Sequence, residues 1–227
     1  MRLVEEQKSA RRAQIIDSAS RLIEKGGVEG LTMARVAEGA RVTVPTVYNL
    51  VGNRDAVVAA VMDAARDRFL DTLRASGDEA AARDAGERTS DAEQVIAVVE
   101  AFVTELSDRA RLYQPIVQIG LRSDVDRGEA IRDVLEPRLQ SAVATMHARG
   151  ALADWVAPGF AAERLCALVL NAGWTWSLER IGTDSLRRCV LHDVAAYLAG
   201  VCVGETRVRF ERIAASHQPG DRARSGS

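Results

Sequence analysis

Hydrophobic residues recur at helical spacing along almost the whole chain. Between Ser9 and Lys25 apolar side chains return every three or four positions, and a pair of glycines follows directly. Glycine commonly ends a helix, so this segment predicts one helix with a defined end. No stretch of useful length alternates with the period of two that marks a half-buried strand. The pattern therefore predicts an all-α protein.

Later segments repeat this spacing. Asn53 and Ser90 are residue types that favour the start of a helix, and an apolar-periodic run follows each of them. Pro115 and Pro137 fall inside two further runs, where proline is expected to kink or divide a helix. These further runs predict helices at 110–121, 129–149, 158–181 and 185–203.

Three segments lack the pattern. Met1–Lys8 is polar and predicts a loose end. Ser76–Thr89 is rich in alanine, glycine and charge, and predicts an exposed linker. Gln218–Ser227 is polar and predicts a disordered tail.

The segment from Leu31 to Asp55 differs from the rest because its predicted helices are very short. Thr32 is placed to cap the first of them and Thr43 the second. Pro45 falls in the first turn of the second helix, where its missing N–H costs nothing. Such a short, polar helix contributes little to a core but suits insertion into a DNA major groove. The segment therefore predicts a DNA-binding regulator.

The second short helix carries side chains that suit contacts with DNA. Its start at Thr43 leaves backbone N–H groups that can face a phosphate. Residues 44–46 offer a small apolar surface for thymine methyl groups. Tyr48 and Asn49 follow with a hydroxyl and an amide that can reach a phosphate or a base edge.

Arg54 breaks the usual charge rule of a helix. It lies in the first turn of the helix that Asn53 caps, where the helix dipole disfavours a cation. A bound DNA phosphate would explain its position. An ordinary ion pair with Asp55 would also explain it, and the nearby Thr43 and Tyr48 favour the phosphate.

These residues resemble the TetR family of bacterial transcriptional regulators. The resemblance runs from Ser9 to Phe69, and it rests on the run TVPTVYN at 43–49 and on GNRD at 52–55. It implies an all-α fold with an N-terminal three-helix helix-turn-helix domain and a larger helical domain for ligand binding and dimerisation. We expect these domains at 9–69 and 70–217, the motif at 32–51, and a disordered tail at 218–227. By matching position, the resemblance implies DNA-binding roles for Thr32, Thr43, Val44, Pro45, Thr46, Tyr48, Asn49 and Arg54. Arg41, which departs from the family pattern, is added to this set as a candidate phosphate contact.

Two positions depart from the family pattern. Arg41 stands where the family usually has the glycine of the turn, and a non-glycine residue in a left-handed conformation costs on the order of 1 kcal/mol. Either the turn takes another shape, or a phosphate contact of Arg41 offsets this cost. Val51 stands where Phe is common, so the core of the small domain is under-filled or repacked from elsewhere.

The charge distribution agrees with a local DNA-binding surface. The chain of 227 residues has a formal net charge of −2, yet residues 1–55 hold nine basic and seven acidic side chains. A locally basic segment can bind phosphates although the whole chain is slightly acidic. No apolar run is long enough to span a membrane and no signal segment is visible. We therefore expect a soluble, cytoplasmic protein.

The region beyond Asp91 shows no catalytic pattern. Its three histidines are too dispersed for a metal triad, and no glycine-rich phosphate loop is present. The three cysteines lie far apart within apolar runs, which favours buried structural thiols over a redox switch. We expect no enzymatic activity, no cofactor and no metal site.

The resemblance also implies partners. Pro158–Ile181 and Ser185–Val203 would pair with their copies in a second subunit, and the homodimer would present two recognition helices about 34 Å apart to double-stranded operator DNA. A small apolar or aromatic effector would bind inside the larger domain. Its candidate contacts, each better explained by ordinary core or dimer packing, are Phe102, Tyr113, Met146, His147, Trp155, Asn171 and Trp174.

The predicted function is therefore a sequence-specific transcriptional repressor that a small molecule releases from its operator. A ligand-independent DNA-binding protein or an activator is the alternative. A helical enzyme is the third possibility, and the lack of clustered nucleophiles, bases or metal ligands argues against it.

Overall fold

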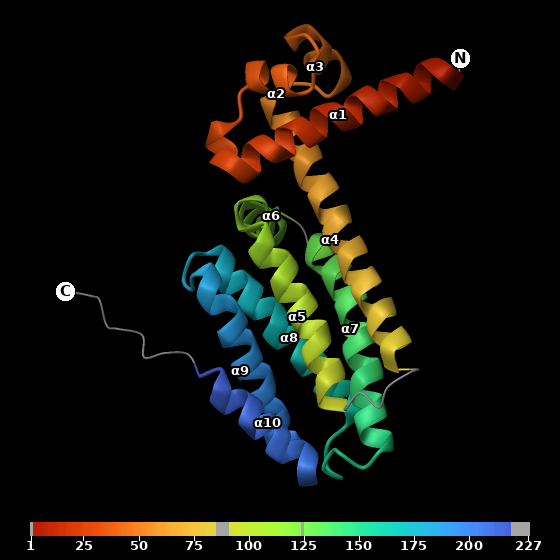
Figure 1. Cartoon of the computed structure of the whole chain (residues 1–227), viewed down its shortest axis with the longest axis vertical. Helices are drawn as coiled ribbons and strands as arrows, with labels where there is room; N and C mark the ends of the chain where they lie inside the picture. Colours follow the sequence, from red (N-terminus) through yellow and green to blue (C-terminus); the bar gives the residue numbers. More distant parts are fainter. Residues whose placement is uncertain (1, 85–90, 124, 219–227) are drawn as a thin grey trace, which may run out of the picture. The chain divides into compact units, whose positions relative to one another are not determined.

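The computed structural model describes residues 2–84, 91–123 and 125–218, and most of them are helical (Figure 1). Within these residues the only strand-like pairing is a single bridge between Leu152 and Cys202. The all-α prediction is confirmed. The elements are α1 (Arg2–Gly26), the 3-10 turn η1 (Val28–Gly30), α2 (Met33–Gly39), α3 (Val44–Leu50), α4 (Arg54–Asp84), α5 (Asp91–Asp108), α6 (Ala110–Ser123), α7 (Val125–Ala148), α8 (Pro158–Ser177), α9 (Thr183–Val201) and α10 (Gly204–Ser216).

The chain divides into two compact units. Unit 1 comprises Met1–Phe69 and Arg109–Ile116, and unit 2 comprises Leu70–Asp108 and Val117–Ser227. The start of α6 therefore packs with the N-terminal helices, although it follows α5 in the sequence. Both α4 and α6 contribute residues to each unit.

Unit 1 is held together by the apolar faces of its helices. On α1, Ile15, Ala19 and Ile23 are spaced four residues apart and are buried. They face α2 and α3, whose buried residues include Val36 and Val47. Burial of a side chain of this size contributes about 1.5–3 kcal/mol. Tertiary packing thus orders two helices that are too short to persist alone.

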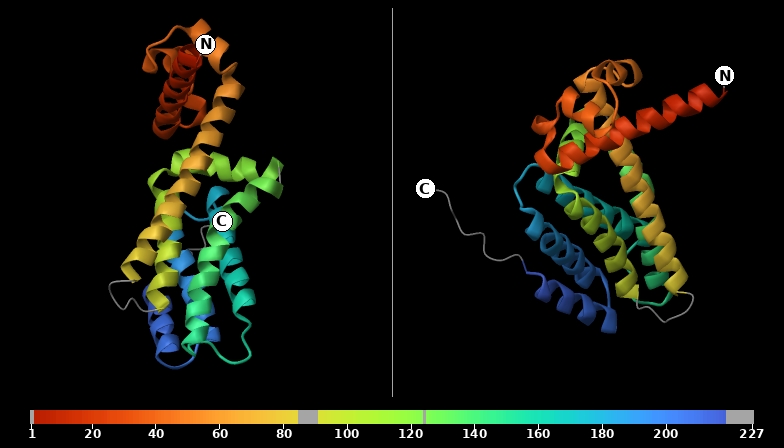
Figure 2. Two further views of the ribbon diagram at one scale, coloured as in Figure 1. Left: turned by 90° about the vertical axis from the view of Figure 1, so that its right-hand side faces the viewer. Right: turned by 45° about the horizontal axis from the view of Figure 1, so that its top comes forward.

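Unit 2 is a helix bundle in which α9 packs against α5, α8 and α10 (Figures 1 and 2). The side chains of Leu186, Val190, Val194 and Leu198 follow the spacing of one helix face, and all four are buried. On the other side of the bundle, α7 packs against α5 and α8. The periodic leucine and valine positions of α9 therefore supply the centre of the core.

The helix α8 has one buried face and one outward face. Leu165, Val169 and Trp176 are buried. On the opposite face Phe160 is 59% exposed and Trp174 is half-buried. A single copy of the chain therefore leaves apolar side chains of α8 uncovered.

The first helix is longer than the sequence predicts. Because α1 begins at Arg2, the segment 2–8 is helical rather than loose. Likewise α4 continues to Asp84, so residues 76–84 are helix and not linker. Three consecutive alanines and further helix-forming residues in this stretch outweigh its one glycine.

Some predictions fall outside the described residues. They concern the remainder of the predicted linker at 85–89, the helix start at Ser90 and positions 219–227 of the predicted tail. Pro115 and Pro137 do not divide their helices, because α6 and α7 run through them. The helix α10 was not predicted, and its buried Phe210 packs it into the bundle.

The cysteines are free thiols, and Cys166 and Cys202 are buried. Burial raises the pKa of the Cys166 thiol to about 11. A thiol that stays protonated at neutral pH is a poor nucleophile. The structural interpretation is therefore the better one for Cys166. Nowhere in the described part of the chain is a helix both long and apolar enough to cross a membrane.

Candidate nucleic-acid interface

Two short helices and the tight turn between them form the predicted helix-turn-helix. Thr32 caps α2, because its hydroxyl accepts a hydrogen bond from the Arg35 backbone N–H at 3.3 Å. After α2 the chain reverses at Arg41, whose φ of 56° lies in the left-handed region. The N–H of Val42 then donates to the carbonyl of Ala37 at 2.9 Å. The turn thus keeps the shape that usually calls for glycine, and Arg41 adopts it at a cost of about 1 kcal/mol.

The helix α3 is anchored by one side and exposed on the other. Val47 is completely buried, whereas Tyr48 is 51% exposed and Asn49 is also exposed. Thr43 is the N-cap residue, but its hydroxyl pairs with the Thr46 hydroxyl at 2.8 Å instead of capping a backbone N–H. The prediction that Thr43 is the N-cap residue of α3 is confirmed. The prediction that its side chain caps a backbone N–H is wrong.

The nine predicted DNA-binding residues all lie in unit 1, and none of them is buried. Val44 and Thr46 are half-buried, and the other seven are exposed. Val51, where the family often has Phe, is the half-buried C-cap of α3 at the edge of the core. A helix that binds in a DNA groove requires an exposed polar face and a buried apolar face that holds it to the core.

Arg54 contacts the protein itself. Its Nε donates to the carbonyl of Leu31 at 3.2 Å, and its Nη2 donates to the carbonyl of Val28 at 2.7 Å. These two bonds hold the turn η1 and the start of α2 against the start of α4. They explain a cation in the first turn of α4 without a bound anion. The alternative explanation, an ion pair with Asp55, is not needed either.

We expect Arg54→Ala to lower the free energy of unfolding of unit 1 by about 1–2 kcal/mol, since two charge-assisted hydrogen bonds are lost. DNA affinity should fall as well, because Thr32 would lose its fixed position. Urea denaturation followed by circular dichroism and a DNA titration would measure the two effects. Arg54→Lys is the control, which keeps the charge but cannot reach both carbonyls. A loss of DNA affinity with unchanged stability would instead assign Arg54 to phosphate binding alone.

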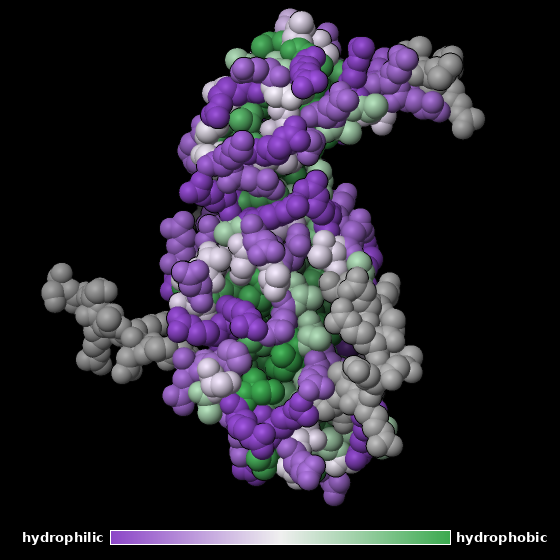
Figure 3. Space-filling model, viewed as in Figure 1, coloured by the Kyte–Doolittle hydropathy of each residue, from purple (hydrophilic) through white to green (hydrophobic). Residues whose placement is uncertain are grey.

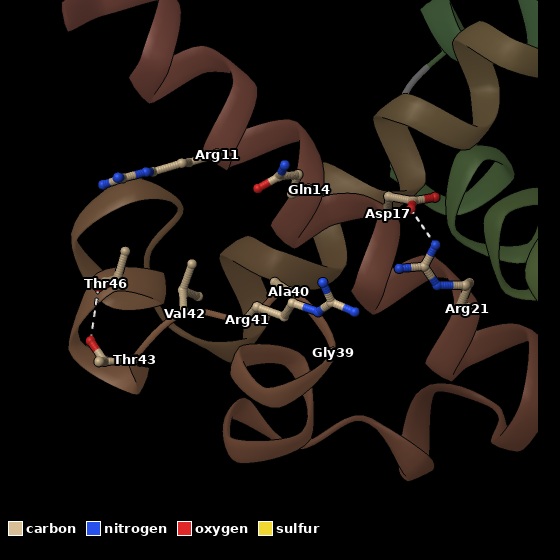
Figure 4. A pocket seen from close by; sticks show the side chains of 10 residues that line it. All are labelled: Arg11, Gln14, Asp17, Arg21, Gly39, Ala40, Arg41, Val42, Thr43 and Thr46. Atoms are coloured by element: carbon tan, nitrogen blue, oxygen red, sulfur yellow. Dashed lines mark hydrogen bonds and ion pairs between the residues drawn. The ribbon is translucent and has the colours of Figure 1, made fainter.

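One face of α1 brings to the helix-turn-helix side chains that were not among the predicted DNA-binding residues. Arg11, Gln14 and Arg21 lie beside the turn between α2 and α3 (Figure 4). In Figure 3 the visible face of α1 is hydrophilic over most of its length. The spacing of these residues on one helix is visible in the sequence, but which face of α1 meets the turn depends on the tertiary packing.

The seven candidate effector contacts do not come together. Tyr113 belongs to unit 1, where its ring packs edge-on against Phe69 with centroids 5.4 Å apart. Trp155 is 75% exposed, and His147 and Asn171 are exposed as well. Phe102, Met146 and Trp174 lie in unit 2, the first two of them buried in its core.

Two cavities of the molecule do not support the seven candidate effector contacts. One cavity of about 500 Å³ is lined by α1 and the turn after α2. Another, of about 840 Å³, is lined by residues of α5 and α10 and by Arg149. Neither of these two cavities is lined by any of the seven candidates.

Part of unit 1 is similar in sequence to a known protein family. The family described as bacterial regulatory proteins of the tetR family matches residues 15–61. The HTH-type transcriptional regulator BetI of Burkholderia thailandensis is 38% identical over 76 residues, which is 33% of this chain and 37% of that protein. The chain thus matches little more than a third of the length of this relative.

Solved structures match the fold over most of the chain. SmeT, the repressor of the Stenotrophomonas maltophilia multidrug efflux pump SmeDEF, matches with a TM-score of 0.57 and 22% identity, over 86% of this chain and 92% of that one. SmeT has also been solved in complex with triclosan. RolR in complex with resorcinol matches with a TM-score of 0.57 and 19% identity, over 93% of this chain and 96% of that one.

The matched segment contains the cap at Thr32, the left-handed turn at Arg41 and the helix α3. The arrangement of helices gives the likeness to SmeT and RolR. Residues 15–61 are therefore similar to the tetR family of bacterial regulatory proteins, and the fold over most of the chain is similar to that of SmeT and RolR.

Proposed function

We propose that this chain is a sequence-specific DNA-binding transcriptional regulator whose helix α3 enters the major groove. The observation that carries the proposal is the two-sided character of α3. Val47 fixes the helix to the core, while Thr43, Pro45, Tyr48 and Asn49 stay exposed. Exposed polar and small apolar side chains on a rigid helix can contact base edges and thymine methyl groups.

Phosphate contacts would set the position of this helix on the duplex. Thr32, at the start of α2, and Tyr48 carry exposed hydroxyls that can donate to phosphate oxygens. Arg41, exposed at the turn before α3, adds a positive charge to unit 1. Arg54 has the different role of holding η1 in place, and it supports these contacts through the protein.

The proposed regulator acts as a homodimer. The outward face of α8 presents Phe160, Leu168, Trp174 and Leu178, all exposed or half-buried in a single chain. A second copy packed on this face and on α9 would remove them from water. It would also provide the second recognition helix that a palindromic operator requires.

The proposed regulator is a repressor that a small molecule releases from DNA. SmeT and RolR, which share the fold, have been solved with triclosan and resorcinol respectively. In this chain α6 contributes residues to both units. Arg111, in its first turn, donates to the carbonyl of Lys25 in unit 1, and Gln118 donates to the carbonyl of Ser177 in unit 2. An effector that moves α6 would therefore bias both units.

Selection of duplex DNA from a randomised pool tests the DNA-binding proposal. We expect the full chain to enrich a palindrome with half-sites about one helical turn apart, and to bind it as a dimer in sedimentation experiments. Genomic footprinting should then show one or few protected sites. Broad coverage without a motif would indicate a DNA organiser, and no enrichment at all would contradict the proposal.

A ligand screen tests the release step. Small apolar and aromatic molecules would be ranked by the rise they cause in the thermal midpoint of the free protein, because a ligand of the native state stabilises it. We expect a hit from this screen to dissociate the complex with the selected duplex. Hits that stabilise the protein but leave the complex intact would support a ligand-independent regulator or an activator.

A further inference from the structure

A polar cavity of about 500 Å³ lies between α1 and the turn that precedes α3, entirely within unit 1 (Figure 4). From α1 it is lined by Arg11, Gln14, Asp17 and Arg21. The opposite wall is formed by residues 39–43 and by Thr46 of α3. The cavity therefore joins the first helix, which lies outside the helix-turn-helix, to the start of the recognition helix.

The charge of this cavity is positive. Arg21 and Asp17 form an ion pair with each other, so they cancel. In the described residues neither the Arg11 nor the Arg41 guanidinium group has a hydrogen-bond or ion-pair partner. Two unpaired guanidinium groups from different elements thus line one space. Guanidinium groups bind phosphate oxygens well because their N–H donors are arranged in a planar fork.

The walls of the cavity are fixed by packing. The buried hydroxyl of Ser18 donates to the carbonyl of Val36 at 3.1 Å and ties α1 to α2. Gly39 permits this approach, since a Cβ at that position would lie 2.3 Å from the Ser18 Oγ. Arg11 therefore projects beside the turn from a rigid position, although its side chain is exposed.

We propose that this cavity receives a phosphate of the DNA backbone, with Arg11 as a phosphate-binding residue on α1. The inference rests on the proposed function and adds to it a contact outside the helix-turn-helix. The occupant is a strand phosphate because the cavity opens beside α3, where Thr43 and Thr46 also line it. All four of Arg11, Gln14, Arg41 and Thr43 are exposed, so a duplex too large to enter the protein can still reach them.

The test compares Arg11→Gln with Arg12→Gln in the full chain, on the duplex selected by the wild-type protein. Both residues are exposed neighbours on α1, and only Arg11 lines the cavity. We expect Arg11→Gln to weaken binding on the order of tenfold for each half-site, and to make the slope of log affinity against log salt shallower by about 0.9 for each lost contact. Arg12→Gln should stay close to the wild type.

Ethylation interference identifies the phosphate. In each half-site, ethylation of one phosphate should block DNA binding by the wild-type protein. The same ethylation should not weaken DNA binding by Arg11→Gln any further. Equal binding by the two variants would overturn the inference, while wild-type binding to the selected duplex would leave the proposed function intact. Failure of the wild type to select any duplex would overturn both.

Inorganic phosphate serves as the probe for a free anion. If millimolar phosphate raises the thermal midpoint of the wild type but not of Arg11→Gln, while both bind DNA equally, the cavity is a small-anion site and the DNA assignment is wrong. We expect no such difference between phosphate and chloride at equal ionic strength.

Discussion

Gly52→Ala is expected to destabilise unit 1 by about 3 kcal/mol. Gly52 joins α3 to α4 with a φ of 122°, a conformation that residues with a Cβ rarely adopt. A Cβ there would also lie 2.9 Å from the Cβ of Ala56, which is fixed to the backbone of α4. The strain and the steric clash act together, and neither can be relieved without moving α3 relative to α4. DNA binding should weaken with the fold.

The location of the tryptophans allows this effect to be assigned to unit 1. Trp155, Trp174 and Trp176 all belong to unit 2. In urea denaturation of Gly52→Ala, we expect loss of helical circular dichroism to begin at lower urea, while the fluorescence midpoint changes little. If circular dichroism and fluorescence instead gave coincident transitions at the wild-type urea concentration, Gly52 would not be needed for the stability of unit 1.

Gly204→Ala is the matched control for backbone strain alone. Gly204 has a φ of 59° and precedes the rest of α10, and a Cβ there would have no heavy atom within 4 Å. We therefore expect a cost of about 1 kcal/mol, detected by fluorescence because this residue lies in unit 2. A larger loss for Gly204→Ala than for Gly52→Ala would contradict the steric argument.

Local sequence signals identified the starts of α2 and α4. Thr32 and Asn53 each accept a hydrogen bond from the backbone N–H three residues later, as N-cap residues do. The turn at Arg41 kept its left-handed shape without glycine, because the surrounding helices fix it and the cost is small. These two helix starts depend on neighbours in sequence and were therefore predictable.

Features that depend on distant neighbours were not. The carbonyls that Arg54 contacts belong to Val28 and Leu31, 26 and 23 residues away, and no charge rule points to them. Residue type alone suggested Tyr113 as an effector contact, yet it packs on Phe69 in unit 1. Arg11 was overlooked for the same reason, since only the packing of α1 brings it beside the turn.

Thr46→Glu is expected to abolish specific DNA binding while preserving the fold. Thr46 lies three residues after the N-cap residue Thr43, which is the position of Glu or Gln in a capping box. The substitution should therefore leave the free energy of unfolding unchanged or raise it slightly. If α3 enters the groove, however, it places a carboxylate against base edges and phosphates in both half-sites. With about 1–3 kcal/mol lost in each half-site, the affinity of a dimer should fall at least about thirtyfold.

Thr46→Gln separates charge from shape. Glutamine has nearly the same size as glutamate and occupies the same position of the capping box, so the two variants should be equally stable in urea denaturation. Only the glutamate variant carries the charge that DNA repels, and its deficit relative to Thr46→Gln should shrink as salt screens that repulsion. Equal DNA affinities for the two variants at low salt would mean that residue 46 does not face the duplex. The recognition helix would then have to be sought elsewhere in unit 1. A helix whose exposed face tolerates a carboxylate cannot be the one that enters the groove.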